Sequence, residues 1–224
     1  MPLVSEKLAP VTLRQQVADR VRNAILSGAL HPGERLVERK ISTELGTSLT
    51  AVREALIQLE TEGFIRKKTN TNTFVSDFSR SELEGVFAVR RLLEGYAFEE
   101  AARRATAAEC DKLQDLFAQT VEAARREDRQ SYIRRDLLWH DAVWQTARNE
   151  CLLESLRRII YPLFGFSAIR VASQPGFDLL ADAQSHDPLL KAIRQNEPAA
   201  ARRAFDEAME AWKADALSYF SRPV

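Results

Sequence analysis

The segment LVERKISTELGTSLTAVREALIQLETEGFIRKK, residues 36–68, contains two helical patterns, a tight turn between them and a basic end. The first pattern predicts a helix over residues 38–45, with Ile41 and Leu45 on its inner face. Gly46 follows directly, at a position where a left-handed backbone costs glycine least. A short helix that ends in such a turn indicates the first half of a helix-turn-helix.

The second helical pattern begins after Ser48, whose hydroxyl can accept hydrogen bonds from the free backbone N–H groups of the first turn. Its buried face has apolar residues at i, i+3, i+4 and i+7, namely Val52, Ala55, Leu56 and Leu59. Thr50, Arg53 and Gln58 lie on the opposite face, and Gly63 ends the helix. This arrangement is typical of a helix that enters the major groove of DNA.

Two short strands are predicted next, over residues 64–68 and 73–75, joined by a turn rich in Thr and Asn. Upstream, the capping box TLRQ at residues 12–15 starts a helix that ends near Gly28. The order helix, helix, helix, hairpin predicts a winged helix-turn-helix domain over residues 8–77.

The chain has 224 residues, of which 32 are basic and 32 acidic, so its formal net charge is zero. Any DNA-binding surface must therefore be local. Two cysteines cannot build a disulfide framework, and no apolar run approaches the ~20 residues that cross a bilayer. The first ten residues lack the basic start and apolar block of a signal peptide. We expect a soluble, cytoplasmic protein.

From residue 79 onward, helical patterns follow one another without strand-like alternation. The predicted helices cover residues 80–104, 107–126, 129–148 and 151–171, then a stretch that ends near 196, and finally 198–220. Pro162 is expected to kink or interrupt the fourth of these helices. Six helices with short links predict a mainly α chain whose second domain, residues 79–222, is an all-α antiparallel bundle.

Three motifs follow one another between Ala24 and Val75: SGALHPGERL at 27–36, TAVREAL at 50–56 and LETEGFI at 59–65. In order and spacing they resemble the GntR family of bacterial transcription regulators, and the helical remainder resembles the FadR subfamily with its FCD-type effector domain. The resemblance implies a regulator, commonly a repressor, that binds a palindromic operator as a homodimer. It also implies that a small metabolite, commonly a carboxylate, binds the helical domain.

Candidate DNA contacts follow from the matched motifs. Ser48 and Thr50 can meet phosphates or base edges at the start of the second helix, and Arg53 can offer a bidentate contact to guanine or a phosphate. Arg39 would join them from the preceding helix. The wing would add Lys68, Thr69 and Asn70 along the DNA backbone or in the minor groove. For each residue the alternative is a solvated surface side chain.

Asp136 and His140 lie one turn apart on the inner face of a predicted helix. A buried carboxylate requires a partner, and a divalent cation is one. Asp-x3-His is similar to the first two metal ligands of FCD domains, which two later histidines usually complete. His186 matches the first of these, Ala208 stands at the second, and Pro188 constrains the backbone near His186. The resemblance thus implies a three-ligand site for Zn, Ni or Mn, and the alternative is a metal-free pocket with an Asp136–His140 pair.

Arg90 and Glu94 are a second polar pair, one turn apart within an apolar stripe. They match a VRxxxE pattern of the family, and the resemblance makes Arg90 a candidate for a bidentate contact to the ligand carboxylate. The alternative is a structural Arg90–Glu94 ion pair. Asn149 is expected to cap the end of the preceding helix, and because the family also has asparagine there, it is the second candidate effector-binding residue.

Three classes of function account for different parts of the chain. A metabolite-responsive regulator accounts for both halves of the chain. A metal-dependent enzyme accounts only for the Asp and His residues, and no nucleophile–base pair of recognisable spacing accompanies them, so we predict no enzyme. A regulator that binds DNA constitutively is motivated by Ala208. Leu49, where the family usually has arginine, leaves room for an operator unlike the family consensus.

Overall fold

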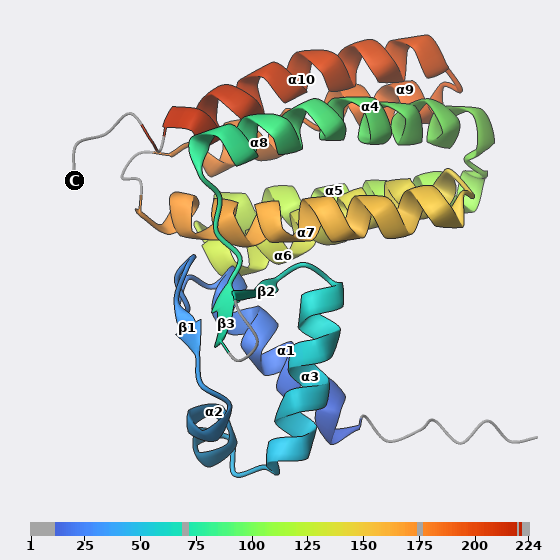
Figure 1. Ribbon diagram of the computed structural model, residues 1–224. Coiled ribbons are helices and arrows are strands. Elements are labelled where there is room, and N and C mark those ends of the chain that lie inside the picture. Colours follow the sequence, from blue (N-terminus) through green and yellow to red (C-terminus); the bar gives the residue numbers. More distant parts are fainter. Residues whose placement is uncertain (1–11, 69–71, 174–176, 219, 221–224) are drawn as a thin grey trace, which may run out of the picture.

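The computed structural model describes residues 12–68, 72–173, 177–218 and 220, which form two packed parts (Figure 1). A small domain of helices and a three-stranded sheet lies against a larger bundle of long helices. Among the described helices, none is long and apolar enough to cross a membrane. A winged helix-turn-helix followed by a helical bundle confirms the predicted fold class.

The elements of the N-terminal domain are α1 (Leu13–Leu26), β1 (Arg35–Leu36), α2 (Glu38–Glu44), α3 (Leu49–Thr61), β2 (Ile65–Lys68) and β3 (Asn72–Val75). The strands are antiparallel in the order β1-β3-β2. The sequence predicted the β2–β3 hairpin but not β1, because two residues are too few to show alternation. β1 forms through tertiary pairing, with Arg35 opposite Phe74 of β3.

The start and the buried face of α3 agree with the sequence pattern. The Ser48 hydroxyl accepts a hydrogen bond from the Ala51 N–H at 3.2 Å, which caps the helix. The residues that α1 and α3 bury together are Val17, Val21, Ile25, Val52, Ala55, Leu56 and Leu59. Gly46 and Gly63 have φ of 59° and 80°, so both turns use the left-handed conformation. The prediction that Leu45 lies on an inner face is wrong, because its side chain is 40% exposed and the seven-residue α2 buries no side chain.

The bundle is built from α4 (Arg80–Arg104), α5 (Ala107–Arg125), α6 (Arg129–Thr146), α7 (Glu150–Ser173), α8 (Leu179–Gln184), α9 (Asp187–Arg194) and α10 (Pro198–Ser218). α4 and α10 lie side by side, whereas α5, α6 and α7 form the layer nearer the N-terminal domain (Figure 1). Reciprocal capping boxes at Ser79/Glu82 and Thr106/Glu109 start α4 and α5 as predicted.

Two helix predictions for the bundle need correction. The single helix expected before Asn196 is α8 and α9, with the chain turning at Ser185 and His186. Pro188 lies in the first turn of α9, where the missing backbone N–H costs nothing. α7 continues through Pro162, so this proline does not interrupt the helix, and the alternative of a kink stays a prediction.

The two parts of the chain meet where α3 ends. A Cβ atom on Gly63 would lie 2.6 Å from Pro162 Cγ and 2.7 Å from the Arg158 carbonyl oxygen, both on α7. The next residue is Phe64, whose ring centroid lies 5.7 Å from that of Tyr161, which is also on α7. The turn after α3 therefore touches the bundle directly, and glycine is required there by close approach as well as by φ.

Candidate functional site

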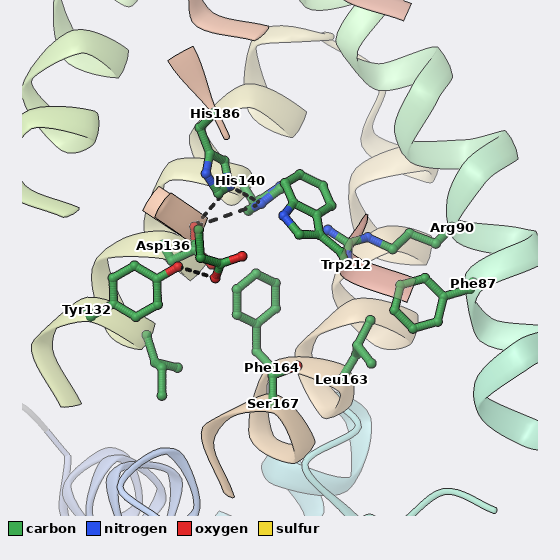
Figure 2. Close-up of a pocket in the computed structure, with 12 residues that line it drawn as sticks. Phe87, Arg90, Tyr132, Asp136, His140, Leu163, Phe164, Ser167, His186 and Trp212 are labelled. Atoms are coloured by element: carbon green, nitrogen blue, oxygen red, sulfur yellow. Dashed lines mark hydrogen bonds and ion pairs between the residues drawn. The ribbon is translucent and has the colours of Figure 1, made fainter. Parts of the chain in front are cut away.

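A cavity of about 50 Å³ lies within the bundle (Figure 2). Side chains from several helices line it, including Arg90 of α4, Asp136 and His140 of α6, and Trp212 of α10. His186, at the N-cap of α9, completes the polar wall because the turn between α8 and α9 brings it to the same place. Asp136 and His140 are neighbours on α6, whereas Arg90, His186 and Trp212 are far from them in sequence and reach the cavity only through helix packing.

Three metal-ligand atoms converge at one side of this cavity (Figure 2). The Nε2 atoms of His140 and His186 are 3.1 Å apart. Asp136 Oδ1 is 3.1 Å from His186 Nε2 and 4.0 Å from His140 Nε2. The structure therefore brings together the three predicted ligands. Asp136 lies closer to His186 than to His140, its neighbour on α6, which the metal-free alternative had paired with it.

The outer nitrogens of both imidazoles face acceptors. His140 Nδ1 is 2.7 Å from Glu94 Oε1, and His186 Nδ1 is 3.1 Å from the Ala183 carbonyl oxygen. An ionised carboxylate and a carbonyl can only accept, so both Nδ1 atoms carry the proton. In the neutral imidazoles, the two Nε2 lone pairs then face each other and the Asp136 carboxylate. This convergence requires a cation, which is either a metal ion or an added proton.

The electrostatics of the pair Asp136 and His186 agree with that requirement. Burial alone would lower the pKa of His186, but the Asp136 carboxylate outweighs burial and holds the pKa above its ordinary value. Burial would likewise raise the pKa of Asp136, but His186 holds it below its ordinary value. Without a metal ion, this pair favours a carboxylate beside an imidazolium.

Glu94 is fully buried and connects three side chains. It accepts hydrogen bonds from Arg90 Nε at 2.5 Å and from Trp144 Nε1 at 2.9 Å, in addition to the His140 contact. Burial alone would raise the pKa of Glu94, but Arg90 and His140 lower it to about 2, so this carboxylate is ionised. The sequence suggested the Arg90–Glu94 pair but not the contact to His140, since that contact depends on how α4 packs against α6.

Arg90 is 5% exposed and lines the cavity. Its Cζ atom lies 4.9 Å from the centroid of a ring of Trp212 and 5.9 Å from that of Phe87. Within the described part of the chain, its Nη atoms have no hydrogen-bond partner. A buried guanidinium with unused donors favours an anionic ligand.

Trp212 stands one turn beyond Ala208 on α10. Its ring centroid is 5.1 Å from that of His186 and 5.7 Å from that of His140, and its Nε1 donates to Ser185 Oγ at 3.2 Å. Trp212 lines the cavity, whereas Ala208 is not among the lining residues. α10 therefore contributes an aromatic wall to the site and no metal-ligand atom among the described residues.

Asn149 lies away from this cavity, and its predicted role as a C-cap is wrong. Its Oδ1 accepts a hydrogen bond from the Leu152 N–H at 3.1 Å, so the side chain caps the start of α7. α6 ends at Thr146 with Ala147 as its C-cap, and Arg148 then takes a φ of 52°. Asparagine is favourable as a cap at either end of a helix, and the sequence did not show which of the two helices Asn149 would cap.

No pattern in the sequence indicated Asp141 of α6, whose carboxylate binds two side chains of α7. Its carboxylate accepts from Arg157 Nε at 2.7 Å, Arg157 Nη2 at 2.8 Å and Tyr161 Oη at 2.8 Å. Burial alone would raise the pKa of Asp141, but Arg157 and Tyr161 outweigh burial and hold the pKa below its ordinary value. No spacing signal was available, because the partners are on another helix.

We expect Asp141→Asn to lower the free energy of unfolding at pH 7 by about 1–2 kcal/mol, a modest loss because Arg157 is partly solvated. Since the folded pKa of Asp141 is depressed, its stabilisation is present above the unfolded value of about 3.9 and disappears as pH falls through the folded pKa. Urea titrations at pH 7 and pH 3 should therefore show a smaller difference between variant and wild type in acid. Asp111→Asn, at an exposed site, should match wild type at both pH values.

Most candidate DNA contacts lie at the end of the N-terminal domain farthest from the bundle (Figure 1). Arg39, Thr50 and Arg53 are exposed on α2 and α3. Ser48 is exposed too, with its hydroxyl engaged in the cap. On the wing, Lys68 ends β2 opposite Asn72, while Thr69 and Asn70 lie outside the described residues.

Arg53 and Leu49 define the exposed start of α3. Arg53 Nε lies 2.7 Å from Glu38 Oε2, and both side chains remain open to solvent. Such a pair is worth about 0–1 kcal/mol and does not prevent a new contact to DNA. Leu49 is 36% exposed on the first turn, so its methyl groups are available on this surface.

Comparisons with known proteins agree with both halves of the structure. Residues 13–75 match the family described as bacterial regulatory proteins, gntR family, and residues 85–211 match the FCD domain. The chain is 27% identical over 214 residues to the "Probable D-xylose utilization operon transcriptional repressor" of Paenarthrobacter nicotinovorans, covering 95% of this chain and 92% of that protein. It is 24% identical over 205 residues to the Escherichia coli HTH-type transcriptional regulator McbR, covering 91% of this chain and 92% of that protein.

Among solved structures, Escherichia coli McbR/YncC superimposes with a TM-score of 0.82 over 94% of this chain and 100% of that chain, at 22% identity. This likeness supports the fold. The matched families and the two sequence relatives are transcription regulators and not enzymes. The chain belongs to the GntR family of bacterial transcription regulators, with an N-terminal DNA-binding domain and a C-terminal FCD domain.

Proposed function

We propose that this regulator represses transcription by binding a palindromic operator as a homodimer, and that a small carboxylate in the FCD cavity, bound beside a metal ion, changes operator affinity. One observation carries the sensing part of this proposal. The same cavity contains three converging metal-ligand atoms and a buried arginine whose Nη donors are unused within the described chain.

Asp136, His140 and His186 would hold the metal ion, and Glu94 would orient His140 through its Nδ1 proton. Two imidazole nitrogens and one carboxylate oxygen suit Zn, Ni or Mn. When bound, the ion would supply positive charge and open coordination positions for an oxygen ligand. Support for a metal comes from the lone pairs of these residues, which converge within the bundle and require a cation between them.

Arg90 would bind the carboxylate of the effector, because its unused donors match the two oxygens of such a group. The cavity of about 50 Å³ is much smaller than the ~300–1,000 Å³ typical of sites for drug-sized ligands. We therefore favour a small ligand, or a larger one whose entry displaces Trp212. A relative named for a D-xylose utilization operon makes small sugar-derived acids the first compounds to test.

The operator would be read by the start of α3 in the major groove. Thr50, Arg53 and Arg39 would contact bases or phosphates, and Leu49 could meet a thymine methyl group. Lys68 and the wing residues Thr69 and Asn70 would supply phosphate or minor-groove contacts that weaken with salt. Two copies of the domain would read two half-sites, which is the reason to expect a palindrome.

The test combines metal analysis with ligand titration. We expect one metal ion per chain and release by a chelator. Metal binding should weaken as pH falls through the pKa of His186, which Asp136 holds above the ordinary histidine value of about 6.5. An active carboxylate should raise the melting temperature and release operator DNA from the metal-loaded protein only. Arg90→Met should keep the metal and lose the carboxylate response. Absence of both metal and any DNA-releasing compound would support the alternative, a regulator that binds DNA constitutively.

A further inference from the structure

One face of α4 carries exposed apolar side chains at helical spacing. Val89 is 41%, Leu92 67% and Tyr96 40% exposed, and their spacing of three and four residues aligns them along one stripe. These are three of the nine large hydrophobic side chains that the described chain exposes, and they are the only ones on α4. An aligned set on one helix favours an interface more than three scattered residues would.

Gly85 continues the same stripe, because it precedes Leu92 by seven residues, or about two helical turns. Glycine in the interior of an exposed helix destabilises that helix relative to alanine. A Cβ atom built on Gly85 would meet no atom of the described chain within 4 Å. Packing within the chain therefore gives no reason for the small residue, whereas close approach of another helix would.

We propose that the α4 stripe packs against the α4 stripe of a second copy, antiparallel, with Tyr96 of one copy lying over Gly85 of the other. In this register Leu92 faces Val89 of the second copy, and the two-fold axis passes between residues 90 and 91. The Tyr96 end of each stripe meets the Gly85 end of the other, where there is no side chain. The surface is therefore complementary to a second copy of itself. This self-complementarity makes the occupant a second copy of the chain and not an unrelated helix.

Charges at the ends of the stripe fit the antiparallel direction. Glu82 and Glu84 flank its N-terminal end, and Arg103 lies at its C-terminal end, on the side of Leu92 and Tyr96. All three side chains are 47–52% exposed. Antiparallel pairing brings the acidic end of one α4 near the basic end of the other, and it also opposes the two helix dipoles favourably.

The inference rests on the proposed homodimer, and sedimentation of the full-length chain separates the two. We expect wild type to be a dimer at micromolar concentration and Leu92→Glu to weaken association at least 10-fold. Leu138→Glu is the matched control, since Leu138 is 41% exposed on α6, and it should remain as dimeric as wild type. A monomeric wild type would refute the homodimer itself. A Leu92→Glu protein that associates as tightly as wild type would refute the α4 interface while leaving the homodimer standing.

A second pair of variants tests the register. Gly85→Leu has room within the chain but would collide with Tyr96 of the second copy, so we expect weaker dimerisation. Because leucine favours the helix more than glycine does, the melting temperature of the monomer should be unchanged or higher. Adding Tyr96→Ala should restore association by removing the opposing ring. If Gly85→Leu dimerises like wild type, or if Tyr96→Ala gives no recovery in the Gly85→Leu background, the Tyr96–Gly85 register is wrong.

Discussion

Replacing His140 by alanine is expected to abolish the effector response while leaving basal operator binding unchanged. The substitution removes one of the three converging ligand atoms, and it also leaves the ionised Glu94 without its imidazole partner. Loss of a ligand should cost metal affinity at least as much as loss of a ligand's hydrogen-bond partner, which is roughly 10- to 100-fold. The candidate DNA contacts lie in the other domain, which should keep its structure.

The measurements are metal content of the purified variant and operator release by the active carboxylate. His31→Ala is the matched control, because His31 is the remaining histidine of the chain and is exposed in the N-terminal domain. It should keep both metal and response. If His140→Ala retains induction by the same compound, the cavity around Asp136 is not the sensor.

Replacing Arg53 by alanine is expected to weaken operator binding by roughly 1–3 kcal/mol, or about 5- to 150-fold, if the guanidinium reads a base in the major groove. Arg53 is exposed at the start of α3, and its partner Glu38 is itself open to solvent. The ion pair can therefore open, or hold the guanidinium in place, when DNA arrives. A contact to a phosphate alone would weaken all DNA sequences about equally and lower the salt slope by about one.

Gel-shift titration with an operator selected from random DNA would measure this effect, at two salt concentrations and with a scrambled competitor. Arg125→Ala removes the same charge from an exposed position at the end of α5, far along the chain from the helix-turn-helix, and should not change binding. Unchanged affinity of Arg53→Ala for the operator would remove Arg53 from the set of base-reading residues.

Local rules account for what could be predicted about the N-terminal domain. The cap at Ser48, the apolar spacing of α3 and the glycines at 46 and 63 act within a few residues of each other, so the sequence shows them directly. The missed strand β1 is different. Two residues carry no periodic signal, and β1 exists only because β3 lies beside it.

The candidate site divides in the same way. Asp136 and His140 have i, i+4 spacing, as do Arg90 and Glu94. The sequence therefore predicted that each pair shares one helix face. The Glu94–His140 contact was not predicted, because it joins α4 to α6 across 46 residues. His186 reaches the cluster only because the chain turns between α8 and α9.

By itself, the sequence determined the class of each domain, the start and end of most helices and the family, because helix caps, periodicity and motif spacing are local properties. Tertiary structure alone decided that three lone pairs converge beside a buried arginine, that Trp212 walls the cavity, and that Asn149 serves α7. Those facts depend on how separate helices pack, and the energies of that packing come from contacts between residues far apart in the chain.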